Sequence, residues 1–134
     1  MKAIVCFYDP AGARLPWLLK RGFRHCFACV RDGDYWLLVD AANGVPLVKL
    51  LAQADFDLAA FYRAEGYTVV ETAQRTQPIR CPFSLANCVG LVKAVLAIRA
   101  PFAFTPWQLY RHMTRKLPAT NCRKLPATNW RNAA

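Results

Sequence analysis

The sequence predicts an α+β domain in which a small antiparallel sheet packs on a buried helix that carries a cysteine. Three observations support this fold class. Short β-prone runs separated by turn residues fill the first half of the chain. An Asp-Gly pair joins two of these runs, as in a tight hairpin turn. A nearly all-apolar helical segment follows in the second half, and such a helix requires burial on all sides.

The predicted strands come first along the chain. Each run is apolar or β-branched and is bounded by Gly, Pro, Asn or Asp, which favour turns. One short helix interrupts the strands at residues 55–65, because acids occupy its start and Gly66 follows its end. The strands are expected at residues 2–8, 23–30, 35–42, 45–51 and 67–72.

Two further helices are predicted after the last strand. The apolar helix opens at Ser84 and is expected to continue until Pro101 stops it. Thr105 and Pro106 then provide the preferred start of a final helix, with an N-cap residue followed by proline in the first position. The resulting domain covers residues 1–114, and a basic tail covers residues 115–134.

The tail contains the segment RKLPATN twice, at residues 115–121 and 123–129, and its prolines exclude one continuous helix.

Hydrophobic residues make up 55% of the 134-residue chain, enough for a core without disulfides. No apolar run is long enough to cross a bilayer. The first apolar run closes at Asp9-Pro10 and is too short for a secretory signal, so we expect synthesis and folding in a cytosol.

The hairpin predicts a contact between a histidine and a carboxylate. If Asp32 and Gly33 are the two turn residues, cross-strand partners have numbers that add to 65, and His25 lies opposite Asp40. Directly opposed side chains are close enough for a carboxylate to orient an imidazole, as in a catalytic triad. A different turn length would change this register, and the pair could also serve only to satisfy a half-buried histidine.

Cys88 is the candidate nucleophile. Either Asn87 or Ser84 can cap the apolar helix, and under both choices Cys88 falls in or near its first turn. The helix start lowers the pKa of a thiol, and the free backbone N–H groups there can stabilise an oxyanion. The alternative is an ordinary core cysteine on a buried helix.

The order of these residues resembles the circularly permuted papain-like hydrolases, relatives of the NlpC-type cell-wall peptidases and of lecithin retinol acyltransferase. The resemblance covers residues 23–110 and rests on a strand histidine, a polar residue on the next strand and Asn-Cys at a helix start. It implies that Cys88 is the nucleophile, His25 the general base and Asp40 the orienting residue. Val89-Gly90 departs from the acyltransferase continuation, which favours amide hydrolysis over acyl transfer to a lipid.

The other cysteines predict neither a disulfide framework nor a metal site. Most of the six lie in apolar segments, where Cys behaves as a small hydrophobe. Cys26 and Cys29 match the CxxC pattern, but on a strand they point to opposite faces and cannot bind one zinc ion together. We therefore expect no metal and no cofactor.

The positive charge is concentrated in the second half of the chain. Residues 1–71 hold eight acids and eight bases, whereas residues 72–134 hold ten bases and no acid. Such a surface favours an acidic protein or another polyanion as partner. A solvated coat that keeps an apolar protein soluble is the alternative.

Together these features predict a thiol-dependent hydrolase of amide or peptide bonds, with peptidoglycan as a candidate substrate. In this mechanism Cys88, activated by His25, forms a thioester that water resolves. The competing hypothesis is a non-enzymatic component of a larger assembly, such as a phage particle, that uses residues 72–134 as its interface. Nucleic-acid binding is a third class, but the sequence contains no recognisable nucleic-acid-binding motif.

Overall fold

The computed structural model describes residues 1–11, 19–42, 44–74 and 87–115. Most of the duplicated tail lies outside the described residues, as does Ser84. The described chain forms five strands and three helices. Their bounds are β1 Lys2–Tyr8, β2 His25–Asp32, β3 Tyr35–Ala42, β4 Val45–Gln53, α1 Leu58–Ala64, β5 Thr68–Ala73, α2 Cys88–Leu96 and α3 Pro106–Arg115.

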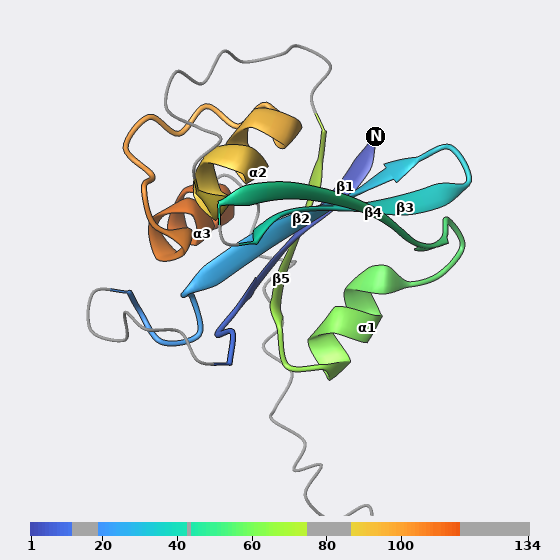
Figure 1. Cartoon of the computed structure of the whole chain (residues 1–134), viewed down its shortest axis with the longest axis horizontal. Helices are drawn as coiled ribbons and strands as arrows, with labels where there is room; N and C mark the ends of the chain where they lie inside the picture. The colour runs from blue at the N-terminus through green and yellow to red at the C-terminus, as the bar shows by residue number, and fades with distance from the viewer. Residues whose placement is uncertain (12–18, 43, 75–86, 116–134) are drawn as a thin grey trace, which may run out of the picture.

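The five strands form one antiparallel sheet with the order β4-β3-β2-β1-β5. α1 covers one face of the sheet, and α2 and α3 cover the other (Figure 1). The α+β class and the antiparallel sheet are thereby confirmed. In the part of the chain that is described, none of the helices has the length and hydrophobicity needed to span a membrane.

Strands β1 and β2, in the interior of the sheet, are buried on both faces. This burial explains why their sequences are apolar without alternation. Odd-numbered residues of β1 and even-numbered residues of β2 contact α2 and α3, whereas their neighbours contact α1. Cys26 and Cys29 therefore face opposite sides of the sheet, as strand geometry predicts. The sheet separates the described thiols into two groups.

The hairpin between β2 and β3 differs from the sequence prediction in its register. Asp32 pairs with Tyr35, so the turn residues are Gly33 and Asp34, and the partner numbers add to 67. Gly33 has φ 54°, and a positive φ at the first central residue only is the pattern of a type II′ turn. The prediction of a type I′ turn at Asp32 and Gly33 was therefore wrong by two residues in the register.

At the opposite end of this hairpin the two strands separate. Their ladder ends at Ala28 and Val39, although β2 extends back to His25. The flanking ladders continue, since His25 still pairs with Tyr8 of β1 and Asp40 still pairs with Leu47 of β4. Side chains of β2 and β3, in place of backbone bonds, meet across this opening.

The cysteine-bearing helix is shorter than predicted. It begins at Cys88, after the N-cap Asn87, and ends at Leu96 rather than at Pro101. Ala97 adopts the left-handed conformation with φ 52°, and the Ile98 N–H donates to the Lys93 carbonyl at 2.9 Å, which closes the helix as a Schellman-type end does. The helix therefore ends through its own backbone hydrogen bonds, several residues before Pro101.

The other two helices begin with side-chain caps. Asp57 accepts from the Ala60 N–H at 3.0 Å, so α1 starts at Leu58 and the acids before it lie outside the helix. Thr105 accepts from the Gln108 N–H at 3.3 Å, and the Gln108 side chain accepts from the Thr105 N–H at 3.1 Å. This reciprocal capping box confirms the predicted start of α3.

Candidate active site

His25 and Asp40 form a direct hydrogen bond where β2 and β3 separate. Nε2 of His25 donates to Oδ1 of Asp40 at 2.7 Å, and the two side chains are 16% and 14% exposed. The predicted contact is present although the predicted register was wrong. An error of two residues still leaves both side chains on the same face of the sheet. They are diagonal neighbours rather than directly opposed, which is still within reach of long side chains.

Two further contacts fix the geometry of this pair. The backbone N–H of Ala41 donates to the same Asp40 oxygen at 2.7 Å, which holds the carboxylate. The ring of Tyr8, on the neighbouring strand β1, meets the His25 ring edge to face at 5.5 Å between centroids. Since Nε2 is engaged by Asp40, the Nδ1 atom of His25 is the ring nitrogen available to a further partner.

Cys88 is the first residue of α2, and the sequence explains why it lies there. The side chain of Asn87 accepts from the Gly90 N–H at 2.7 Å, so the helix begins at the following residue. Backbone N–H groups in the first turn have no partner within the helix, and they give its start a positive potential. Cys88 is half-buried and packs against the core beneath α2 and α3.

The contacts of Cys88 favour its thiolate form. A hydrogen bond from the Cys26 thiol, together with the hydrogen bond and charge of His25, outweighs burial and lowers the pKa of Cys88 to about 4. The Cys26 backbone N–H also hydrogen-bonds the Cys88 sulfur. The structure therefore brings the three predicted residues together, because Cys88 contacts His25 and His25 contacts Asp40.

His25 is correspondingly stabilised as an imidazolium. Burial disfavours its charged form, but the hydrogen bonds and charges of Asp40 and Cys88 together outweigh burial and raise the pKa of His25 to about 9. At neutral pH the arrangement is thus a thiolate and imidazolium ion pair with a carboxylate behind it. Such a pair can attack an electrophilic carbon and then protonate a leaving group.

The sequence did not predict that Cys26 contacts Cys88 and helps to lower its pKa. Cys26 follows His25 on β2, is completely buried and lies under the start of α2. Its own pKa is raised, first because its thiol hydrogen-bonds Cys88 and second because it is buried. The available signal was its position next to the histidine, on the face of β2 opposite to that of His25.

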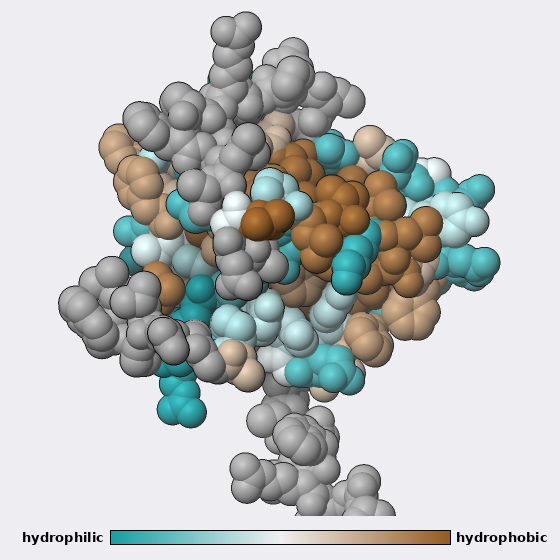
Figure 2. Space-filling model, viewed as in Figure 1, coloured by the Kyte–Doolittle hydropathy of each residue, from teal (hydrophilic) through white to brown (hydrophobic). Residues whose placement is uncertain are grey.

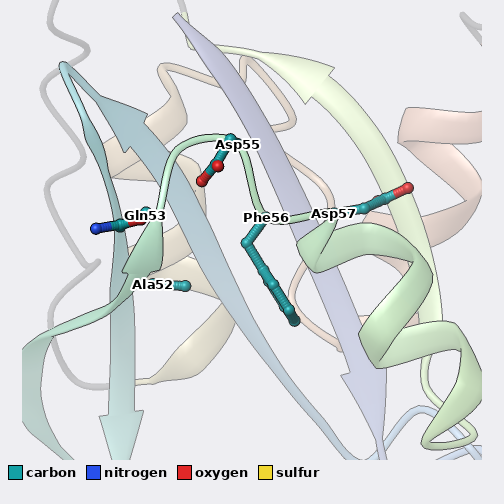
Figure 3. Close-up of a pocket in the computed structure, with 5 residues that line it drawn as sticks. All are labelled: Ala52, Gln53, Asp55, Phe56 and Asp57. Atoms are coloured by element: carbon teal, nitrogen blue, oxygen red, sulfur yellow. The ribbon is translucent and has the colours of Figure 1, made fainter.

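A hollow elsewhere on the described surface contains none of these residues. It has a volume of about 480 Å³ and is lined by Gln53 and the connection from β4 to α1 (Figure 3). Gln53 pairs with Tyr35 beside the hairpin turn, at the far end of β3 from Asp40.

Among the residues that the structure describes, no group of three or more His, Cys, Asp and Glu is placed to hold a metal ion.

Comparison with known proteins found no protein-family model, curated protein or solved structure that matches this chain. The function is therefore inferred from the geometry of the site itself.

Proposed function

We propose that this protein is a thiol hydrolase that cleaves amide or peptide bonds through Cys88, His25 and Asp40, in a domain of the permuted papain-like, NlpC-type class. The hydrogen bond of 2.7 Å between His25 and Asp40, with His25 also in contact with a thiol at a helix start, is the observation that carries this proposal. The chain order of histidine strand, carboxylate strand and cysteine helix agrees with the resemblance on which the class was predicted.

In the proposed reaction, the Cys88 thiolate attacks the carbonyl carbon and forms a C–S bond. The carbonyl oxygen becomes an oxyanion, for which the backbone N–H groups at the start of α2 are fixed donors. His25 then gives its proton to the amide nitrogen, the C–N bond breaks and an amine leaves. The product on the protein is a thioester at Cys88.

Hydrolysis of the thioester returns the site to its first state. The neutral His25 accepts a proton from water, and the resulting hydroxide attacks the thioester carbon. The C–S bond breaks, a carboxylic acid is released, and the Cys88 thiolate and the His25 imidazolium are restored. Asp40 holds the ring in the orientation needed for both steps and stabilises its positive charge.

The proposal is tested by capturing the thioester. The full chain is mixed with peptides released from peptidoglycan and with simple peptide amides, quenched in acid, and digested for mass spectrometry of the Cys88 peptide. We expect an acyl adduct on Cys88 and a free amine product. The matched control is Cys29→Ser, which alters a buried thiol on the other face of the sheet and should leave the adduct unchanged.

Cys88→Ala should eliminate both the adduct and the amine. If amine release persists in Cys88→Ala, a different residue performs the hydrolysis and the proposal fails. If none of the amides yields an adduct in the wild-type protein while Cys88 still reacts with iodoacetamide, the thiol is activated for another purpose, and amide hydrolysis is rejected.

A second candidate function is supported by the surface of β4. This edge strand exposes Val45, Val48 and Leu50 by 62–66%, and Figure 2 shows a continuous apolar area over this part of the molecule. Exposed apolar areas of this kind mark contact surfaces. They favour a component of a larger assembly, such as a phage particle, in which residues 72–134 would contact an acidic protein or another polyanion.

Removal of residues 116–134 tests this second function. If the basic half docks an acidic partner, the truncation should weaken binding, and the remaining binding should fall as ionic strength rises. Thermal stability and Cys88 reactivity should stay close to those of the full chain. Binding that is insensitive to both salt and truncation would exclude the electrostatic contact.

A further inference from the structure

The reactive thiol has a second thiol as its hydrogen-bond partner. Cys26 and Cys88 come from different elements, β2 and α2, and meet in the core cluster between the sheet and the helices. Cys26 is 0% exposed, so no reagent reaches it directly from solvent. The other described thiols, Cys6 and Cys29, belong to the cluster on the α1 face and are separated from Cys88 by the sheet.

We propose that Cys26 and Cys88 form a redox modification site that reacts with hydroperoxides and closes as a disulfide. Cys88 is the attacking thiol and Cys26 the resolving thiol. The inference extends beyond amide hydrolysis and requires no amide substrate, because it uses only the exposed side of Cys88, its contact with His25 and the thiol behind it.

The first step oxidises Cys88 with a hydroperoxide as the oxidant. The thiolate attacks one peroxide oxygen, an S–O bond forms and the O–O bond breaks. The leaving oxygen takes a proton from the His25 imidazolium and departs as an alcohol, or as water when the oxidant is hydrogen peroxide. Cys88 is then a neutral sulfenic acid and His25 a neutral imidazole.

The second step joins the two sulfurs. The Cys26 sulfur attacks the Cys88 sulfur, and the S–O bond breaks as the S–S bond forms. The Cys26 proton passes to the departing oxygen, which leaves as water. The peroxide is reduced by two electrons, which come from the two thiols, and an external dithiol is needed to restore them.

The environment of Cys26 changes in the direction that this second step requires. Its hydrogen bond to Cys88 is the largest cause that raises the pKa of Cys26, so Cys26 stays protonated while Cys88 is a thiolate. Conversion of Cys88 to a neutral sulfenic acid removes that negative charge. Cys26 therefore becomes easier to deprotonate only after Cys88 has been oxidised.

The test maps the disulfide in the full chain. Protein treated with hydrogen peroxide in small stoichiometric steps is blocked with N-ethylmaleimide, digested with trypsin without reduction and analysed by mass spectrometry. Trypsin places Cys26 and Cys29 together on residues 25–31, and Cys81 and Cys88 together on residues 81–93. A parallel sample of the variant Cys29→Ser with Cys81→Ser therefore makes the bond assignment unambiguous, and fragmentation of the wild-type peptides provides the same assignment without substitution.

We expect a linked pair of these peptides within one chain, joined through Cys26 and Cys88 and released by dithiothreitol. In Cys26→Ser, dimedone should trap about tenfold more sulfenic acid on Cys88, which then proceeds to the sulfinic acid. Circular dichroism checks that this variant is folded. If it is not folded, the disulfide map of the wild-type protein alone decides whether Cys26 and Cys88 are joined.

Three results would overturn the proposal. Wild-type Cys88 could reach the sulfinic acid while Cys26 remains alkylatable after denaturation. Cys88 could pair with another cysteine, including Cys81 or Cys122, which lie outside the described residues. The bond could also join two chains, which a non-reducing gel would show. None of these outcomes depends on whether the protein hydrolyses amides, so the two proposals can fail separately.

Discussion

Cys88 and Cys29 are thiols of one domain with opposite acid–base behaviour. Burial raises the pKa of Cys29 to about 12, although a hydrogen bond from Tyr62 acts in the other direction. The pKa of Cys88 is lowered to about 4, although burial raises it as well. Both sulfurs accept a hydrogen bond from a neutral side chain, so that feature does not distinguish them.

The difference lies in the charge of the partners. Cys88 contacts the cationic ring of His25 and lies at the positive start of α2, whereas Cys29 is in the middle of a strand against α1. Removing a thiolate from water is costly unless a positive group is held in contact with it. The two thiols therefore differ in acid–base behaviour through one histidine and one helix end, not through burial.

Among variants that still fold, replacement of Asp40 by Asn should cause the largest loss of the chemical activity that distinguishes Cys88 from Cys29. The amide cannot stabilise the His25 imidazolium or hold its tautomer, so we expect kcat for amide hydrolysis to fall about 10⁴-fold. Glu71→Gln is the matched control, because Glu71 is a carboxylate that bonds Lys2 and Arg63 near the surface. A comparable loss in both variants would indicate a general effect on stability rather than a role in the site.

The two thiols should also differ in their rates of alkylation. At pH 7 almost all Cys88 and a very small fraction of Cys29 are thiolate, but a thiolate of low pKa is intrinsically less nucleophilic. The net advantage of Cys88 is then on the order of tens of fold before access is considered. Limiting iodoacetamide at pH 6.5, followed by peptide mapping, should label Cys88 first among all six cysteines. Earlier labelling of Cys6 or Cys122 would contradict an activated Cys88.

The pH dependences of alkylation and of amide hydrolysis should distinguish the role of Cys88 as nucleophile from the role of His25 as acid. Alkylation requires only the thiolate, so its rate should fall below pH about 4, where Cys88 is protonated, and should not decline near pH 9. Amide hydrolysis also requires a protonated His25, so its rate should decline as the pH rises through about 9. A hydrolysis profile without the alkaline limb would remove His25 from the role of proton donor.

Replacement of Cys26 by Ala should have the smallest effect. It removes one thiol donor and leaves His25 in place, so the pKa of Cys88 should rise and its labelling at pH 5 should fall several-fold, with the midpoint read from a pH titration of alkylation rate. Cys26→Ser retains a hydroxyl donor and should restore most of the shift. Equal midpoints in the wild type and Cys26→Ala would show that the thiol contact is electrostatically neutral.

The sequence predicted the contact between His25 and Asp40 but not the register that produces it. Asp-Gly suggested a type I′ turn, whereas the chain uses Gly33 and Asp34, and local turn preferences differ too little to choose between these two. The prediction of the pair survived because the error was even, and an even shift preserves the face of a strand. An odd error would have placed Asp40 on the other face.

Other features depended on tertiary contacts that local patterns do not contain. Apolar runs indicated β1 and β2 as strands, but not that Cys26 lies under Cys88, since that contact joins residues far apart in the chain. The early end of α2 depends on a left-handed Ala97, a conformation that alanine rarely adopts and no sequence rule predicts. The strand order also required the long-range pairing of β1 with β5.

The separation of the site residues along the chain has a consequence for folding. His25 and Asp40 belong to one hairpin, 15 residues apart, whereas Cys88 reaches them only when α2 docks on the completed sheet. Local contacts close faster than distant ones, so we expect the histidine and carboxylate to meet early during refolding and the thiol to keep an ordinary pKa until late. Pulsed alkylation during refolding at pH 6 would measure this order, and Cys88 would then report the moment at which the chain becomes native.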